Sequence, residues 1–170
     1  MKILCFTDCL GAGGAQRQLV GLASMLHQRG MDVKVCYYFD RPFYKDDLDE
    51  AGVPHELILS ADNHIKRIPA VTKFFSKEKP DWVIAYQGTP SLVATFAKIM
   101  GGHFHLIVSE RTTTQHTGFN ERLRFNSFRW ADYIVPNAYT QEKYIKSTFP
   151  FLSKKVVTIP NFVDLDHFDL

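Results

Sequence analysis

The stretch that decides the fold is residues 2–17, Lys-Ile-Leu-Cys-Phe-Thr-Asp-Cys-Leu-Gly-Ala-Gly-Gly-Ala-Gln-Arg. Residues 3–7 form a short apolar run typical of a buried strand, three glycines follow, and a helical pattern begins at Ala15. A helix that starts after a strand and a glycine turn presents unpaired N–H groups and a positive dipole end, which favour phosphate. The glycines therefore predict either an anion-binding loop or only a tight turn between strand and helix.

Apolar strands and amphipathic helices alternate along the rest of the chain. Besides 3–7, strands are predicted at 33–39, 56–59, 79–86, 105–109, 132–135 and 155–159, and helices at 15–27, 43–51, 63–78, 91–100, 120–130 and 140–148. This alternation is typical of a parallel sheet with helices on both faces. We predict an α/β fold: a single Rossmann-like, doubly wound, mostly parallel sheet of about seven strands. Such sheets bind ligands outside the carboxyl ends of their strands, here loops 8–14, 40–42, 87–90, 110–118 and 136–138.

Size and composition indicate one ordinary globular domain. The chain has 170 residues, of which 45% are hydrophobic and 22% charged, and its net charge of +2 gives no reason to expect a nucleic-acid partner. No stretch approaches the roughly 20 apolar residues of a transmembrane helix, so any membrane contact would be peripheral. Cys5, Cys9 and Cys36 lack metal-site spacing and are predicted to be reduced core thiols of a cytoplasmic protein.

A nicotinamide-binding domain is one alternative for the glycine stretch. Its fingerprint is G-x-G-x-x-G, with an acidic residue at the end of the second strand that contacts the ribose. Gly11 and Gly13 fill the first two positions, and Asp40 stands where the acid is expected. Gln16 occupies the third glycine position, and the loop after the first strand is longer than usual. Both departures weaken the dinucleotide interpretation.

Four segments resemble family 4 glycosyltransferases with the two-domain GT-B fold. Residues 13–16, Gly-Gly-Ala-Gln, resemble the family's G-G-x-[EQ] loop, and Val-Ser-Glu-Arg-Thr at 108–112 follows the fifth strand as it does in the family. Trp-Ala-Asp-Tyr-Ile-Val-Pro-Asn-Ala at 130–138 is similar to the "ADxVVxxS" strand, with Asn137 where serine is common. Val-Thr-Ile-Pro-Asn-Phe-Val-Asp at 157–164 is similar to the "V-I-x-N-G-V-D" segment that ends the N-terminal domain, and it is the most specific of the four.

The resemblance implies a domain organisation and an activity. Residues 1–160 would be the acceptor-side N-terminal domain and 161–170 the start of the interdomain hinge, with the C-terminal donor-binding domain and its E-x7-E element absent. The expected reaction transfers a sugar from a UDP- or GDP-sugar to a glycan or polyprenyl-linked acceptor in polysaccharide assembly, with retention and without metal or cofactor. Residues 1–170 alone would be inactive. The alternative is a non-catalytic Rossmann-like module that binds a phosphorylated sugar, a nucleotide or a partner subunit.

The predicted site residues lie at the carboxyl ends of strands. Gly13 and Gly14 would contact the donor diphosphate, whose leaving oxygens gain charge in the transition state. Arg111 would bind an acceptor phosphate, and Glu110 would orient an acceptor hydroxyl, both facing the cleft. The alternative for these two is that they pair with each other or with a neighbouring helix end.

Further polar residues are weaker candidates. His116 would act as a general base because the ordinary histidine pKa lies near neutrality, or it is simply solvated. Gln87 and Asn137 would bind sugar hydroxyls, or else cap loops. His103 and His105 have H-x-H spacing but no carboxylate nearby in sequence, so no metal site is predicted there.

Residues 119–130 combine four aromatic side chains with Arg122, Arg124 and Arg129. That composition is typical of a helix lying on an anionic membrane surface, and an ordinary core-facing helix is the alternative. Support for the membrane interpretation comes from a second basic set, namely Lys66, Arg67, Lys73 and Lys77. If it holds, the protein binds peripherally to the inner face of the membrane and its acceptor is lipid-linked.

Overall fold

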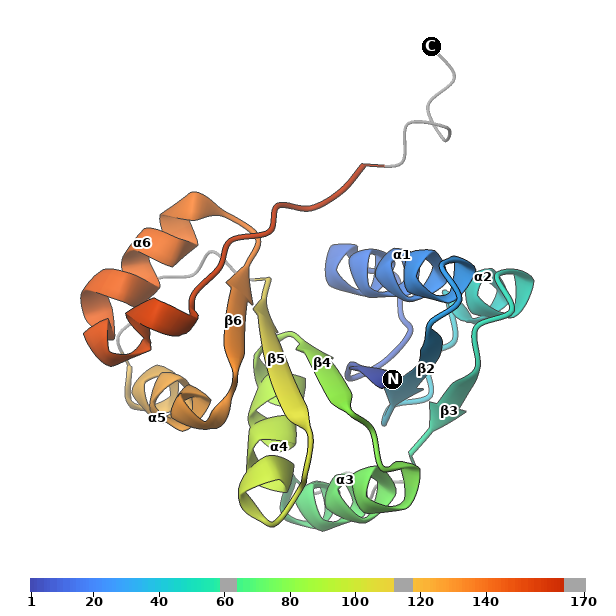
Figure 1. The fold of residues 1–170 in the computed structure, drawn as a ribbon, viewed down its shortest axis with the longest axis horizontal. Coiled ribbons are helices and arrows are strands. Elements are labelled where there is room, and N and C mark those ends of the chain that lie inside the picture. The colour runs from blue at the N-terminus through green and yellow to red at the C-terminus, as the bar shows by residue number, and fades with distance from the viewer. Residues whose placement is uncertain (59–63, 112–117, 164–170) are drawn as a thin grey trace.

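A computed structural model describes residues 1–58, 64–111 and 118–163. One six-stranded, fully parallel sheet runs through it in the order β3-β2-β1-β4-β5-β6 (Figure 1). The strands are β1 (Lys2–Phe6), β2 (Asp32–Tyr37), β3 (His55–Leu57), β4 (Trp82–Tyr86), β5 (His105–Glu110) and β6 (Tyr133–Pro136). The helices are α1 (Gly14–Gln28), α2 (Lys45–Glu50), α3 (His64–Glu78), α4 (Gly88–Ile99), α5 (Phe119–Ser127), η1 (Phe128–Trp130), α6 (Tyr139–Thr148) and η2 (Pro150–Lys155). The predicted doubly wound α/β class is confirmed.

Helices cover the two faces of the sheet unequally. On one face, α3, α4, α5 and α6 bury the side chains of all the strands except β3 in one continuous core. On the other face, α1 and α2 pack over β1 and β2 (Figure 1). The half of that second face formed by β4, β5 and β6 carries no helix among the described residues, so Trp82 and Ile84 are only partly buried.

The predicted seventh strand does not join the sheet as a full strand. Val156 makes one isolated parallel bridge to Ile134 of β6. Beyond it, Val157 and Ile159 donate their backbone N–H groups to the carbonyls of Ile134 and Pro136, at 3.0 and 3.1 Å. Pro136 has no N–H group to donate in return, so the ladder remains one-sided. A proline at the end of β6 thus explains why the sheet has six strands.

The three cysteines behave as predicted for core thiols. Cys5, Cys9 and Cys36 are free and buried. Burial raises the pKa of Cys5 to about 12, so this thiol stays protonated and unreactive at neutral pH. None of the described helices is both long and apolar enough to cross a membrane.

Candidate functional site

The order of the strands reverses between β1 and β4, and in open parallel sheets the crevice at such a reversal is where ligands bind. Three polar side chains meet there, which we call the switch-point network: Asp8 after β1, Gln16 in α1 and Gln87 after β4. Asp8 Oδ1 accepts from the Cys9 backbone at 2.7 Å and from Gln16 Nε2 at 3.1 Å. The Gln87 amide, with its orientation assigned from these partners, donates to the two Asp8 oxygens at 3.0 and 3.1 Å and accepts from Gln16 Nε2 at 3.0 Å.

Gln87 is also strained in its backbone. It precedes α4 with φ 72° and ψ 165°, a region that glycine occupies readily and other residues rarely do. Its N–H donates to the Ser109 carbonyl at 3.1 Å, which fixes the strained residue to β5. The Gln87 amide contacts Asp8 and Gln16, and the binding of sugar hydroxyls by this partly exposed side chain stays a prediction.

The two glycines of the turn have different surroundings. A Cβ on Gly13 would lie 2.4 Å from Gln16 Oε1, so any larger residue there would make the Gln16 amide move. A Cβ on Gly14 would meet no described atom within 4 Å. In the described part of the chain, no side chain caps α1 and no acidic residue lies in its first turn, while Arg17 there is exposed. The start of α1 is therefore uncapped, and its backbone N–H groups and the positive end of its dipole suit an anion.

Glu110 and Arg111 point to opposite faces of the sheet because they are successive residues at a strand end. Glu110 is fully buried on the α5 side, where Arg124 Nη1 donates to its Oε1 at 2.6 Å. The expectation that Glu110 faces the cleft is therefore wrong, and its partner is Arg124 rather than Arg111. Burial raises the Glu110 pKa and the Arg124 charge partly offsets this effect, while Glu110 Oε2 has no partner in the described ranges.

Arg111 lies on the cleft side, across the ends of β4 and β5. Its guanidinium stacks 4.4 Å from the centre of the Tyr86 ring and donates to Tyr86 Oη at 2.8 Å. A second donor of the same group, Nη1, binds Asn161 Oδ1 at 2.7 Å. Arg111 Nε is buried without a partner among the described residues. Arg111 thus joins the end of β4 to the segment that follows residue 160.

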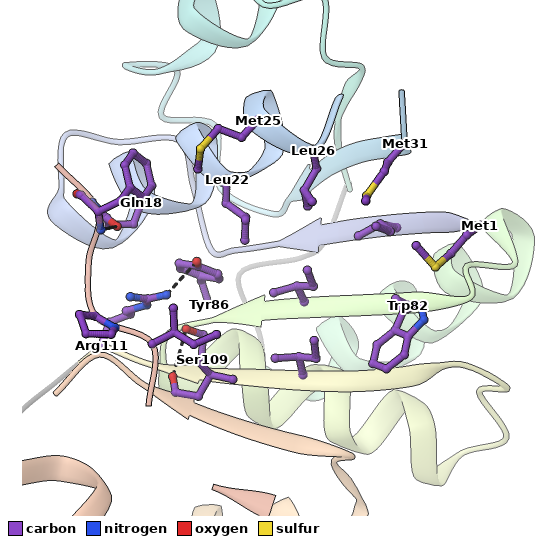
Figure 2. Close-up of a pocket in the computed structure, with 17 residues that line it drawn as sticks. Met1, Gln18, Leu22, Met25, Leu26, Met31, Trp82, Tyr86, Ser109 and Arg111 are labelled. Carbon is purple, nitrogen blue, oxygen red and sulfur yellow. Dashed lines mark hydrogen bonds between the residues drawn. The ribbon is translucent and has the colours of Figure 1, made fainter. Parts of the chain in front are cut away.

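An apolar pocket of about 600 Å³ extends from Arg111 along the uncovered half of the sheet (Figure 2). Leu22, Met25 and Leu26 of α1 border one side of it. Arg111, hydrogen-bonded to Tyr86, closes the carboxyl end of the pocket in Figure 2.

The remaining predicted site residues are distributed as follows. Asn137 follows β6 and donates its backbone N–H to the Glu110 carbonyl at 3.2 Å, and its buried Oδ1 lacks a partner in the part of the chain described. His116 lies outside the described residues. His105 lies at the amino end of β5, where its Nδ1 is 3.4 Å from Asp132 Oδ1 and its ring stacks on Trp82.

The predicted membrane-contacting arginines separate into two groups. Arg122 and Arg129 are exposed, whereas Arg124 points inward to Glu110 and also pairs with Glu121. Arg124 is therefore removed from the candidate membrane surface. Arg129 lies 5.5 Å from the ring centres of both Trp130 and Phe151, two half-exposed aromatic side chains.

Sequence reasoning missed two residues of the site, Asp8 and Tyr86, and one contact. Asp8 comes directly after the first strand, which was a usable signal because that position adjoins the crevice. The sequence predicts Tyr86 only as part of a strand, and no sequence pattern indicates its hydrogen bond with Arg111. The Arg124–Glu110 pair joins positions 14 residues apart, through the packing of α5 on the sheet.

Comparisons with known proteins identify a family and several similar structures. A family model described as Glycosyltransferase Family 4 matches residues 12–167, and a search of curated proteins found no match. Among solved structures, Anabaena Alr3699/HepE in complex with UDP-glucose is similar at a TM-score of 0.79 and 17% identity, covering 98% of this chain and 45% of that one. A glycosyltransferase from Rickettsia africae ESF-5 has a TM-score of 0.71 at 12% identity, with coverage of 99% and 45%. The UDP-GlcNAc 2-epimerase from Neisseria meningitidis bound to UDP-GlcNAc has a TM-score of 0.70 at 17% identity, with coverage of 95% and 47%. The chain thus spans less than half the length of these structures, which share its fold.

Proposed function

Because the chain belongs to glycosyltransferase family 4, we propose that it forms the acceptor-side domain of a GT-B enzyme that transfers a sugar from a UDP- or GDP-sugar. The observation that carries the proposal is the uncapped start of α1 beside the switch-point crevice. A leaving nucleoside diphosphate gains negative charge, and fixed N–H groups at Gly14 would stabilise it in the transition state. Similar folds solved with UDP or UDP-sugars support a nucleotide-sugar donor.

The acceptor would lie along the ends of β4, β5 and β6. Arg111 supplies positive charge there, and its unpartnered Nε suits an anionic oxygen of the acceptor. The unpartnered Oδ1 of Asn137 suits a donating sugar hydroxyl. Glu110 would act indirectly, by holding α5 through Arg124, because it is buried and already paired. Transfer would proceed with retention to a glycan or lipid-linked acceptor.

The test compares residues 1–170 with the longest native reading frame that contains them. Each is assayed for hydrolysis of, and transfer from, a panel of UDP- and GDP-sugars. We expect activity only in the longer protein, since the donor would be held between this domain and a second Rossmann-like domain. No activity in either, with nucleotide binding by residues 1–170, would favour the non-catalytic binding module.

Peripheral contact with an anionic membrane would bring a lipid-linked acceptor to this site. Phe119, Leu123 and Trp130 expose 81%, 49% and 47% of their surface on α5 and η1, with Arg122 and Arg129 among them. Exposed aromatic and basic side chains together suit the headgroup region. Pelleting with anionic and with neutral liposomes tests this contact, and equal recovery with both would contradict it.

A further inference from the structure

Gln87 keeps a side chain at a position where the backbone favours glycine. With φ 72° and ψ 165°, a glycine would adopt this geometry with little strain, whereas glutamine is held there by its surroundings. Strained residues of this kind occur where a side chain is required in a fixed place. The reason for the strain is therefore to be sought in what the Gln87 amide contacts.

The contacts of Gln87 lead to the glycine turn in two steps. Its amide oxygen accepts from Gln16 Nε2 at 3.0 Å, and its amide nitrogen donates to the Asp8 carboxylate. Gln16 Oε1 in turn lies so close to Gly13 that a Cβ there would be only 2.4 Å away. The next residue, Gly14, faces open space. Through Gln16, the Gln87 amide is thus in close contact with the turn at Gly13.

We infer that Gln87 is a positioning residue that fixes the glycine turn for the donor diphosphate. The inference rests on the proposed function and deepens it, because it assigns different roles to the two glycines. Gly13 accommodates the Gln16 amide, and Gly14 meets the ligand. The backbone of Gln87 is anchored to β5 through Ser109, so the network ties the first half of the sheet to the second at the crevice.

The experiment uses the full-length protein and two substitutions, one that removes the Gln87 amide and one that replaces it by a carboxylate. Gln87→Gly removes the amide and the backbone strain together, and we expect kcat to fall about tenfold to a hundredfold, with less than about a threefold change in the donor KM. Gln87→Glu keeps the size but sets a second carboxylate beside Asp8, which raises the pKa of the new group. Its protonated form donates to Asp8 again, so kcat relative to wild type should rise as the pH is lowered from about 8 to about 5.5.

Lys79→Gly is the matched control. Lys79 also has a positive φ, 49°, but it precedes β4 at the amino ends of the strands, away from the crevice. This variant should therefore retain wild-type kcat. The readout that a purely structural role would not produce is the acid recovery of Gln87→Glu. A pH-independent loss in that variant, or wild-type kcat in Gln87→Gly, would overturn the inference.

A readout without turnover separates this inference from the proposed function. Amide hydrogen exchange of residues 11–16 should be faster in Gln87→Gly than in wild type and unchanged in Lys79→Gly. If wild type transfers no sugar but this difference appears, the positioning of the turn stands and the proposed reaction fails. If exchange in the turn is equal in all three proteins, the positioning role is refuted whatever the activity.

Discussion

Replacing Arg124 by methionine would leave a buried carboxylate without its partner. Glu110 is fully buried, and Arg124, whose side chain is 13% exposed, donates to it at 2.6 Å. Methionine keeps an apolar stem but loses the guanidinium, whose carbon lies 4.8 and 5.8 Å from the ring centres of Phe125 and Phe128, together with its charge and hydrogen bonds.

The expected cost follows from the burial of the pair. Removing one partner of a buried ion pair destabilises a protein by about 3–5 kcal/mol, because the other charge stays desolvated. With a urea dependence of about 2 kcal/mol per molar, the unfolding midpoint should fall by about 1.5–2.5 M. Changing Glu110 to glutamine as well removes the stranded charge, so the double variant should recover part of the loss.

The loss of stability in Arg124→Met should also depend on pH. Burial already raises the Glu110 pKa, and Arg124 opposes that rise, so its removal lifts the pKa further. The folded variant then binds a proton that the unfolded chain has released, and its stability falls as the pH rises above the ordinary glutamate value of 4.5. The destabilisation should therefore be larger at pH 8 than at pH 5.

Urea unfolding followed by circular dichroism at both pH values measures these quantities. Arg129→Met is the control, because Arg129 is exposed and its loss should change the stability by less than about 0.5 kcal/mol. A midpoint shift for Arg124→Met no larger than that of the control, or equal shifts at the two pH values, would refute the reasoning.

Four further substitutions have defined outcomes. Gly13→Ala should lower the unfolding free energy by about 1–3 kcal/mol because the neighbouring amide must move, whereas Gly14→Ala should raise it by up to about 1 kcal/mol in thermal unfolding. Hydrogen bonds from lysine ammonium groups lower the Glu78 pKa below 4.5, so the wild-type protein loses stability as acid protonates this carboxylate. Glu78→Gln should therefore lower the unfolding free energy by about 1 kcal/mol at pH 7. Urea unfolding at a series of pH values should show a weaker loss of stability in acid for this variant than for wild type. Gln18→Ala removes two hydrogen bonds to the backbone of Phe162, at 2.8 and 3.0 Å, and should speed amide exchange of that residue.

The fold was predictable because its signals are local. Strand and helix periods alternate cleanly, and all six strands were located to within about three residues of their ends. The predicted seventh strand is absent from the sheet because Pro136 of β6 has no N–H group with which to pair. Local patterns do not show which partner a strand will meet.

The site was predictable in place but not in contacts. The carboxyl ends of the strands hold the polar residues, as parallel topology requires. The apolar pattern of the fifth strand ends before Glu110, so the sequence does not show that Glu110 and Arg111 alternate across the sheet. Arg67 is named among the basic residues that favour a membrane surface, yet it is buried with its guanidinium 4.2 Å from the ring centre of Tyr38. Such contacts join distant segments, and a single sequence gives no signal for them.

The unequal covering of the sheet has a consequence for handling residues 1–170 in solution. The uncovered half presents the apolar pocket of about 600 Å³ beside exposed Met1 and half-buried Trp82. An apolar hollow open to water invites contact with other copies as protein concentration rises. Light scattering should therefore show an apparent mass that increases with concentration, and a dye such as ANS should fluoresce on the folded protein. Mild detergent should suppress both effects, because its tails fill the hollow that neighbouring molecules would otherwise share.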